Sequence, residues 1–97
     1  MPSDPWNATK RRINRERHGI DFAVLDEEFV GPFVRRRSDR RGEERWLQFG
    51  LLGSTVIAVV YTMRNGRRRW ISARPARKDE RKRYDEAIAT QARDGPD

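Results

Sequence analysis

The sequence predicts an α+β protein with two N-terminal helices, a three- to four-stranded antiparallel sheet and a C-terminal helix. An apolar run over residues 55–63 is followed by Asn65-Gly66, a dipeptide typical of tight hairpin turns, and then by a strand-like segment over 67–74. Polar segments with helix-capping residues lie on both sides of this hairpin. A length of 97 residues accommodates one domain. We expect its ordered core to run from about residue 6 to about residue 92.

A polar helix is predicted over residues 8–17. Asn7 can accept hydrogen bonds from the first free amides of this helix, and Gly19 is suited to the left-handed residue that ends it. Most of its side chains are charged. We therefore expect Trp6 and Ile13 to hold it against the core.

A second helix is predicted over residues 22–29. Asp21 is suited to cap its first turn, and Gly31-Pro32 ends it because proline cannot continue a helix. A short edge strand is expected over 33–35. The arginine-rich segment 36–42 has almost no hydrophobicity and predicts a mobile loop.

The remaining strands are predicted over 43–52, 55–63 and 67–74, and the last helix over 77–92. Residues 56–60 are apolar without interruption, which indicates burial on both faces and a central place in the sheet. To make a core, we expect the helices to pack over one sheet face. The opposite face, or one end of it, would then stay open and basic.

The basic strand 67–74 is the feature that points most directly to a ligand. Rigid guanidinium groups beside an aromatic ring and a hydroxyl could hold a phosphodiester. Strict alternation divides its side chains into two sets, Arg68, Trp70, Ser72 and Arg74 on one face and Arg67, Arg69, Ile71 and Ala73 on the other.

The composition favours a polyanionic partner. The formal net charge is +7 and the pI is near 10.9, and phosphate contacts made by such a chain release condensed counterions. Charge alone does not distinguish a nucleic acid from an acidic protein, and both kinds of partner are expected here.

Several other classes of site and location are excluded by residue usage. The chain has no cysteine and His18 is its one histidine, so disulfides, thiolate metal sites and multi-histidine metal sites are excluded. We expect no metal and no cofactor. The longest apolar run, about nine residues, is too short to span a membrane as a helix, and the N-terminus does not resemble a signal peptide. A cytoplasmic protein without a membrane partner is therefore expected.

Short motifs along most of the chain together resemble one known family. They are Trp6-Asn7 with Lys10, Asn14, His18-Gly19-Ile20 with Phe22, Glu43-Glu44-Arg45, Gly50, Val59-Val60-Tyr61-Thr62, Arg69-Trp70-Ile71-Ser72-Ala73-Arg74, and Glu80 with Tyr84. This set is similar to the BrnT family of bacterial type II toxins, within the wider RelE-like ribonuclease group. Its most specific part runs from residues 71–74 through Glu80 to Tyr84. The chain departs from the family pattern at Trp70, where an aliphatic residue is common, and in the arginine-rich segment 35–41.

The resemblance implies a compact RelE-like toxin, a metal-independent endoribonuclease that inhibits translation until its antitoxin neutralises it. It further implies a BrnA-like antitoxin of the ribbon-helix-helix type, whose complex with the toxin binds operator DNA. Two other functions are open from the residues alone. One is a non-catalytic basic module that binds nucleic acid, and the other is an interaction subunit that docks an acidic peptide. Without an evident catalytic dyad, the residues by themselves rank the binding module first, and the resemblance reverses that order.

RNA cleavage without metal uses the 2′-hydroxyl of the substrate as nucleophile, so the site must accept a proton and stabilise charge on the phosphate. Arg69 and Arg74 are the candidates for charge stabilisation, with Arg45 able to join them from a neighbouring strand. Because Arg69 and Arg74 fall on opposite faces under strict alternation, a bulge or a strand-end position is required for them to converge. Glu44 and Glu80 are the candidate general bases.

The other candidate residues each have a structural alternative. Glu80 can instead form a helix-start ion pair with Arg77 or Arg83. Tyr84 can donate a proton or stack on a base, or it can be a core ring with its hydroxyl at the surface. The candidate RNA-binding residues are Arg45, Arg67, Arg68, Ser72, His18 and Trp70, with Trp46 as a second stacking ring. His18 also suits the C-terminal end of a helix, and at least one of the two tryptophans is expected in the core.

Overall fold

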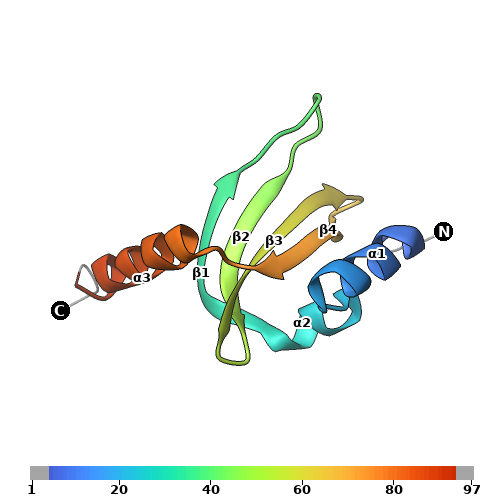
Figure 1. Ribbon diagram of the computed structural model, residues 1–97. Coiled ribbons are helices and arrows are strands. Elements are labelled where there is room, and N and C mark those ends of the chain that lie inside the picture. Colours follow the sequence, from blue (N-terminus) through green and yellow to red (C-terminus); the bar gives the residue numbers. More distant parts are fainter. Residues whose placement is uncertain (1–4, 94–97) are drawn as a thin grey trace.

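The computed structural model describes residues 5–93, which form three helices, a short 3₁₀ turn and one four-stranded sheet (Figure 1). The four strands follow one another in the sheet in chain order, and all neighbours are antiparallel. The predicted α+β class is therefore confirmed. In chain order the elements are α1 (Ala8–His18), η1 (Phe22–Val24), α2 (Leu25–Glu28), β1 (Phe29–Arg37), β2 (Trp46–Leu52), β3 (Thr55–Arg64), β4 (Arg67–Pro75) and α3 (Lys78–Arg93).

Local signals placed most of these elements correctly. Asn7 caps α1 by accepting hydrogen bonds from the amides of Thr9 and Lys10, and Gly19 ends the helix with φ 73°. Asn65 and Gly66 both adopt positive φ in the turn between β3 and β4, which confirms the predicted hairpin.

The second predicted helix is shorter than expected, and the edge strand is longer. The helical segment stops at Glu28, and β1 already begins at Phe29. Gly31-Pro32 lies inside this strand, where the register with β2 shifts between Val30 and Val34. Proline lacks an N–H for the ladder, so an irregular edge strand is where a sheet tolerates it. Phe29, expected at the end of the second helix, thus pairs with β2 instead. The first two arginines of the expected loop 36–42, Arg36 and Arg37, belong to β1.

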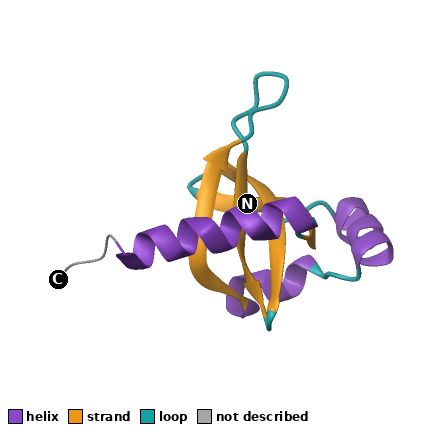
Figure 2. Cartoon of the chain, turned by 60° about the vertical axis from the view of Figure 1, so that its left-hand side comes forward, coloured by secondary structure: helices purple, strands orange, loops and turns teal. Residues whose placement is uncertain are grey.

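The helices cover both faces of the sheet. On β3, Ile57, Val59 and Tyr61 face the cluster built with η1 and α2, whereas Ala58 faces the cluster built with Tyr84 of α3. We call these the N-terminal face and the C-terminal face; Figure 2 shows α3 lying across the latter. The expectation that all helices pack on one face is therefore wrong. The apolar strand 56–60 is buried from both sides, as predicted, and a second helical layer is needed to achieve that.

Helix α1 lies along the outer edge of β4 and satisfies its backbone groups. The amide of Asn14 donates to the carbonyl oxygens of Ala73 at 2.9 Å and Ile20 at 2.8 Å, and its oxygen accepts from the Ala73 N–H at 3.0 Å. The expectation that Ile13 anchors this helix is wrong, since Ile13 is 39% exposed while Asn14 is 5% exposed. Edge strands need such cover because their unpaired groups otherwise attract other strands.

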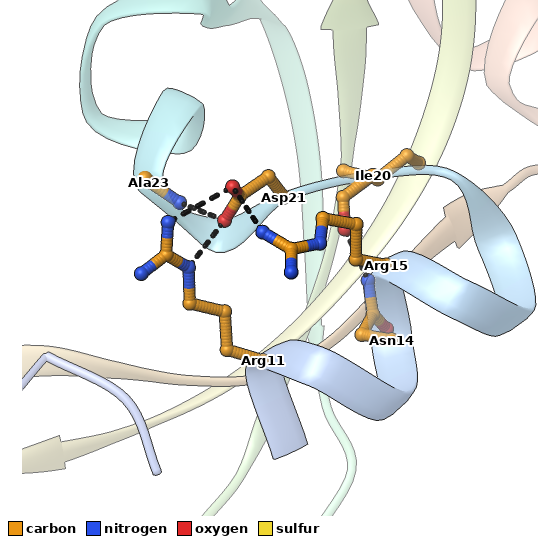
Figure 3. A network of polar contacts seen from close by, with 6 residues as sticks. All are labelled: Arg11, Asn14, Arg15, Ile20, Asp21 and Ala23. Carbon is orange, nitrogen blue, oxygen red and sulfur yellow. Dashed lines mark hydrogen bonds and ion pairs between the residues drawn. The ribbon is translucent and has the colours of Figure 1, made fainter. Parts of the chain in front are cut away.

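An ion-pair network joins α1 to the segment that follows it (Figure 3). Asp21 accepts from the Arg11 Nε at 2.7 Å and from the Ala23 N–H at 3.0 Å, and Arg15 lies 3.5 Å away. The Arg11 guanidinium is the main reason why the pKa of Asp21 lies far below its ordinary value. Asp21 thus caps η1, as predicted, and also fixes α1 in place. Within residues 5–93, the structure contains no helix with the length and apolar character needed to cross a membrane.

Candidate functional site

A β-bulge in β4 decides which arginines share a face. Ser72 pairs with Val60 and Trp70 pairs with Tyr61, so Ile71 is the extra residue on β4. The bulge that the convergence of Arg69 and Arg74 requires is therefore present. Residues on the C-terminal face are Arg67, Arg69, Ser72 and Arg74, and those on the N-terminal face are Arg68, Trp70 and Ala73. The grouping predicted from strict alternation is wrong beyond Ile71, because the bulge moves Ser72 and Arg74 to the face of Arg67 and Arg69 and moves Ala73 to the face of Trp70.

Two adjoining hollows beside this part of β4 form what we call the basic cleft. Their volumes are about 380 Å³ and about 150 Å³, and Lys10, Arg45 and Ile71 line both of them. The cationic lining residues come from α1, the β1–β2 hairpin, β3 and β4, and they are Lys10, Arg17, Arg40, Arg41, Arg45, Arg64 and Arg69. His18 and Ser72 line the larger hollow. Of the residues predicted for the site, the structure brings Arg45, Arg69, Ser72 and His18 together here.

His18 is half-buried at the C-terminal end of α1. Burial is the largest cause that lowers the pKa of its imidazole, and the charges of Arg17 and Arg74 lower it further. The ring is therefore neutral at neutral pH and can accept a proton. This differs from the imidazolium that a helix-end role favours.

Arg74 forms a bidentate ion pair with Glu80 in the first turn of α3, with distances of 2.7 and 2.9 Å. Glu80 also accepts from the Arg77 N–H at 2.8 Å and is 8% exposed. The Arg74 guanidinium is the largest cause that lowers the pKa of Glu80 to about 2. A helix-start ion pair is thus present, but the partner is Arg74; Arg77 donates its backbone N–H, and its charge is the smallest of the causes that lower the pKa of Glu80.

Glu43 is the carboxylate that lines the basic cleft. Its Oε1 accepts from the Arg45 Nε at 2.6 Å, and this bond is the largest cause that lowers the pKa of Glu43. Glu44 lies outside the cleft, 70% exposed on its side chain and paired with Arg37 at 2.8 Å. Sequence reasoning chose Glu44 and missed Glu43. Alternation from Leu47 back to Arg45 and Glu43 was the signal that could have found it.

The other predicted residues lie apart from the basic cleft or have a structural role. Tyr84 is 5% exposed and donates to the Pro32 carbonyl at 2.6 Å, and burial raises the pKa of its phenol. Trp70 borders the smaller hollow of the cleft, but it is 1% exposed and belongs to the core, so it offers no open ring for stacking. Arg67 and Arg68 line a separate hollow beside the β3–β4 hairpin. Sequence reasoning also missed five cations of the cleft, Lys10, Arg17, Arg40, Arg41 and Arg64, because nothing local shows that their segments meet.

Comparison with known proteins identifies one family for this chain. Residues 6–80 match the family model described as a ribonuclease toxin, BrnT, of a type II toxin-antitoxin system. No curated protein and no solved structure matches the chain significantly. A toxin of this kind acts on RNA and has an antitoxin as its partner. With more than three quarters of its length matched, the chain belongs to the BrnT family of ribonuclease toxins.

Proposed function

We propose that this toxin cuts RNA in the basic cleft by a metal-independent attack of the 2′-hydroxyl on the adjacent phosphate. The observation that carries the proposal is that cations from four separate segments line the basic cleft, whose larger hollow also contains the chain's one histidine, a ring with a lowered pKa that is neutral at neutral pH. Arginines suit the charge that grows on the phosphoryl oxygens because the guanidinium binds two oxygens at once and stays protonated. Within residues 5–93, no cluster of three His, Asp or Glu side chains is placed to hold a metal ion.

In this mechanism His18 accepts the proton of the 2′-hydroxyl while its oxygen bonds to phosphorus. The bond from phosphorus to the 5′-oxygen then breaks, and the leaving oxygen takes a proton from water. Arg69 and Arg45 stabilise the negative charge on the phosphate. Glu43 is held ionised by Arg45, so its role is to fix that guanidinium.

Arg74 and Glu80 do not line the basic cleft, and in our proposal they act on it through His18. Both oxygens of Glu80 accept hydrogen bonds, and its low pKa makes it a weak base. We therefore assign it the task of holding Arg74, whose charge lowers the pKa of His18. Glu44 and Tyr84 are not included, because neither lines the basic cleft.

The fold of the antitoxin and its binding to DNA are part of the same proposal. We infer an antitoxin of the ribbon-helix-helix type, related to BrnA, whose complex with this RelE-like toxin binds operator DNA in the cytoplasm. The net charge of +7 supports neutralisation by an acidic segment laid over the cleft.

His18→Gln is expected to lower kcat for RNA cleavage by about 10²-fold, within the range for a lost general base. Because the pKa of His18 lies below 6.5 and the neutral ring is the active form, the wild-type rate should rise with pH through that pKa and stay level above it. The variant should lose this acidic limb. Gel assays of a defined RNA across pH, in buffer containing EDTA, measure both effects.

The control is Arg12→Gln, a change on the exposed side of α1 where Arg12, among the residues that the structure describes, pairs only with Glu16 at 3.6 Å. Its rate and pH profile should match the wild type. A wild-type rate for His18→Gln, or loss of cleavage in EDTA, would contradict the mechanism. RNA that is bound but never cut would favour the non-catalytic binding module.

The antitoxin should cover the basic cleft. When the toxin is bound, cleavage should stop and the amide hydrogens around His18 and Arg45 should exchange more slowly, while those in the last turns of α3 stay unchanged. Hydrogen exchange with mass spectrometry compares the free toxin with the complex. Protection confined to α3, with the cleft still open, would contradict direct occlusion, and a complex that does not shift operator DNA would contradict the proposed repressor role.

A further inference from the structure

The N-terminal face carries a second group of arginines beyond the area that η1 and α2 cover. Register places Arg35 and Arg37 of β1 beside Gln48 and Trp46 of β2 on this face. Tyr61 of β3 pairs with Trp46, and Arg68 of β4 lies over the same region. The surface therefore crosses all four strands on the side opposite to α3.

The guanidinium groups of this surface are stacked on aromatic rings. Those of Arg35 and Arg37 lie 4.5 and 4.9 Å from the ring centre of Trp46. That of Arg68 lies 5.4 Å from the ring centre of Tyr61 and 5.8 Å from that of Trp70. Stacking holds a long side chain in one orientation, so less conformational entropy is lost when a ligand binds it.

Two of these arginines retain an uncompensated charge. Arg37 pairs with Asp39 and Glu44, both at less than 3 Å. Arg35 donates to the Tyr61 hydroxyl at 3.4 Å, and within residues 5–93 neither Arg35 nor Arg68 has a carboxylate within ion-pair distance. Both side chains are exposed. The N–H edges of these guanidinium groups are therefore open to an anion, and the outer sides of their planes are open to stacking by a nucleobase.

A continuous row of cations joins this surface to the basic cleft. Arg64 and Arg69 line the cleft, and they also line the hollow of about 460 Å³ beside the β3–β4 hairpin. Arg67 and Arg68 line the same hollow, and Arg68 belongs to the surface on the N-terminal face. The hairpin thus links the two sites.

We propose that single-stranded RNA next to the cleavage position passes over the β3–β4 hairpin and binds Arg35 and Arg68 on the N-terminal face. This inference rests on the proposed cleft for its starting point. Arg35 and Arg68 bind phosphates, and their stacked planes support a base, as arginine planes do in readers of single-stranded RNA. RNA is favoured over an acidic protein segment because each of these guanidinium groups offers an edge that binds phosphate and a flat surface on which a nucleobase can stack.

The test uses 2′-O-methyl oligonucleotides, which the toxin cannot cut because the nucleophile is blocked. A fluorescent probe of about 12 nucleotides reaches both sites, and one of about 3 nucleotides reaches one only. Arg35→Ala/Arg68→Ala is expected to bind the long probe about tenfold more weakly and the short probe with wild-type affinity. Loss of two phosphate contacts should reduce the slope of log K against log salt by about 1.4. Anisotropy titrations of the full chain at several salt concentrations measure both.

Two further variants serve as controls. The first tests whether the position of the removed charges matters, and the second tests whether stacking matters when the charge is kept. Arg81→Ala/Lys82→Ala removes the same charge from the exposed side of α3 and should leave the difference between the probes unchanged. Arg35→Lys/Arg68→Lys should keep the salt slope but bind the long probe more weakly, because lysine has no plane to stack.

Wild-type affinity of Arg35→Ala/Arg68→Ala for the long probe would overturn the inference, as would an equal loss with both probes. Intact RNA binding with lost antitoxin binding would also overturn it and assign the surface to the protein partner. Failure of the cleft proposal is a separate result, since it appears as undiminished cleavage by His18→Gln.

Discussion

Arg69→Ala is expected to lower kcat/KM for RNA by between about 10²- and 10³-fold, the loss typical of removing one donor that stabilises a charged transition state. Arg69 lies in the basic cleft with Arg45 and Lys10, on the face that it shares with Ser72 and Arg74 because of the bulge at Ile71. Its loss should act mainly on kcat, because charge on the phosphate grows as the reaction proceeds. Single-turnover cleavage of a short RNA measures the effect without a contribution from product release.

Arg67→Ala is the matched control for Arg69→Ala. Both residues lie on β4 and on the same face, but Arg67 is exposed at the hairpin and, unlike Arg69, does not line the basic cleft. Its loss should weaken binding at low salt and leave kcat close to wild type. Arg69→Lys should restore only part of the rate, because an ammonium cannot bind two oxygens in one plane. Equal rates for Arg67→Ala and Arg69→Ala would remove Arg69 from the mechanism.

Arg74→Ala is expected to destabilise the protein by about 3–5 kcal/mol, the range for breaking a buried ion pair by removing one partner. Glu80 would lose both side-chain hydrogen bonds that it accepts from Arg74 and keep only the one from the Arg77 N–H. Since α3 meets the rest of the chain through this turn and through the Tyr84 cluster, its docking should weaken first. Urea unfolding measured by circular dichroism gives the free energy of unfolding. Cleavage should fall as well, because the charge of Arg74 lowers the pKa of His18 and so favours the neutral ring that the mechanism needs.

The same ion pair predicts how stability depends on pH. The folded-state pKa of Glu80 is about 2 and its ordinary value is 4.5. Because the folded value is depressed, the contribution is fully present above pH 4.5 and is lost as the pH falls toward 2. It amounts to about 3 kcal/mol at neutral pH. Arg74→Ala should flatten this part of the curve of unfolding free energy against pH.

Two variants identify the cause of that loss. Arg74→Ala/Glu80→Gln should be more stable than Arg74→Ala alone, since no unpaired charge stays buried in the double variant. Arg77→Ala should be close to wild type, because Arg77 serves Glu80 through its backbone N–H and its side chain is exposed. A double variant that is less stable than Arg74→Ala would show that packing, and not the buried charge, determines the effect.

Much of the fold could be predicted because its signals are local. Asn7 and Asp21 cap the turns that follow them, and Asn65-Gly66 fits a turn in which both residues adopt positive φ. Each of these features needs only neighbouring residues to operate. The error at Phe29 has the opposite origin, since pairing with β2 prevailed over a helical pattern that was only locally favourable.

The candidate site was predictable only in part. The sequence by itself determined that arginines would be abundant around one strand, that His18 would be the one imidazole, and that thiolate chemistry was excluded. The tertiary structure decided which of these groups meet. One extra residue at Ile71 put Ser72 and Arg74 on the same face of β4 as Arg69, and the β1–β2 hairpin brought Glu43 and Arg45 next to Lys10 of α1. Neither result can be read from periodicity, because a bulge depends on how two strands pair and a cleft depends on segments that are distant in the chain.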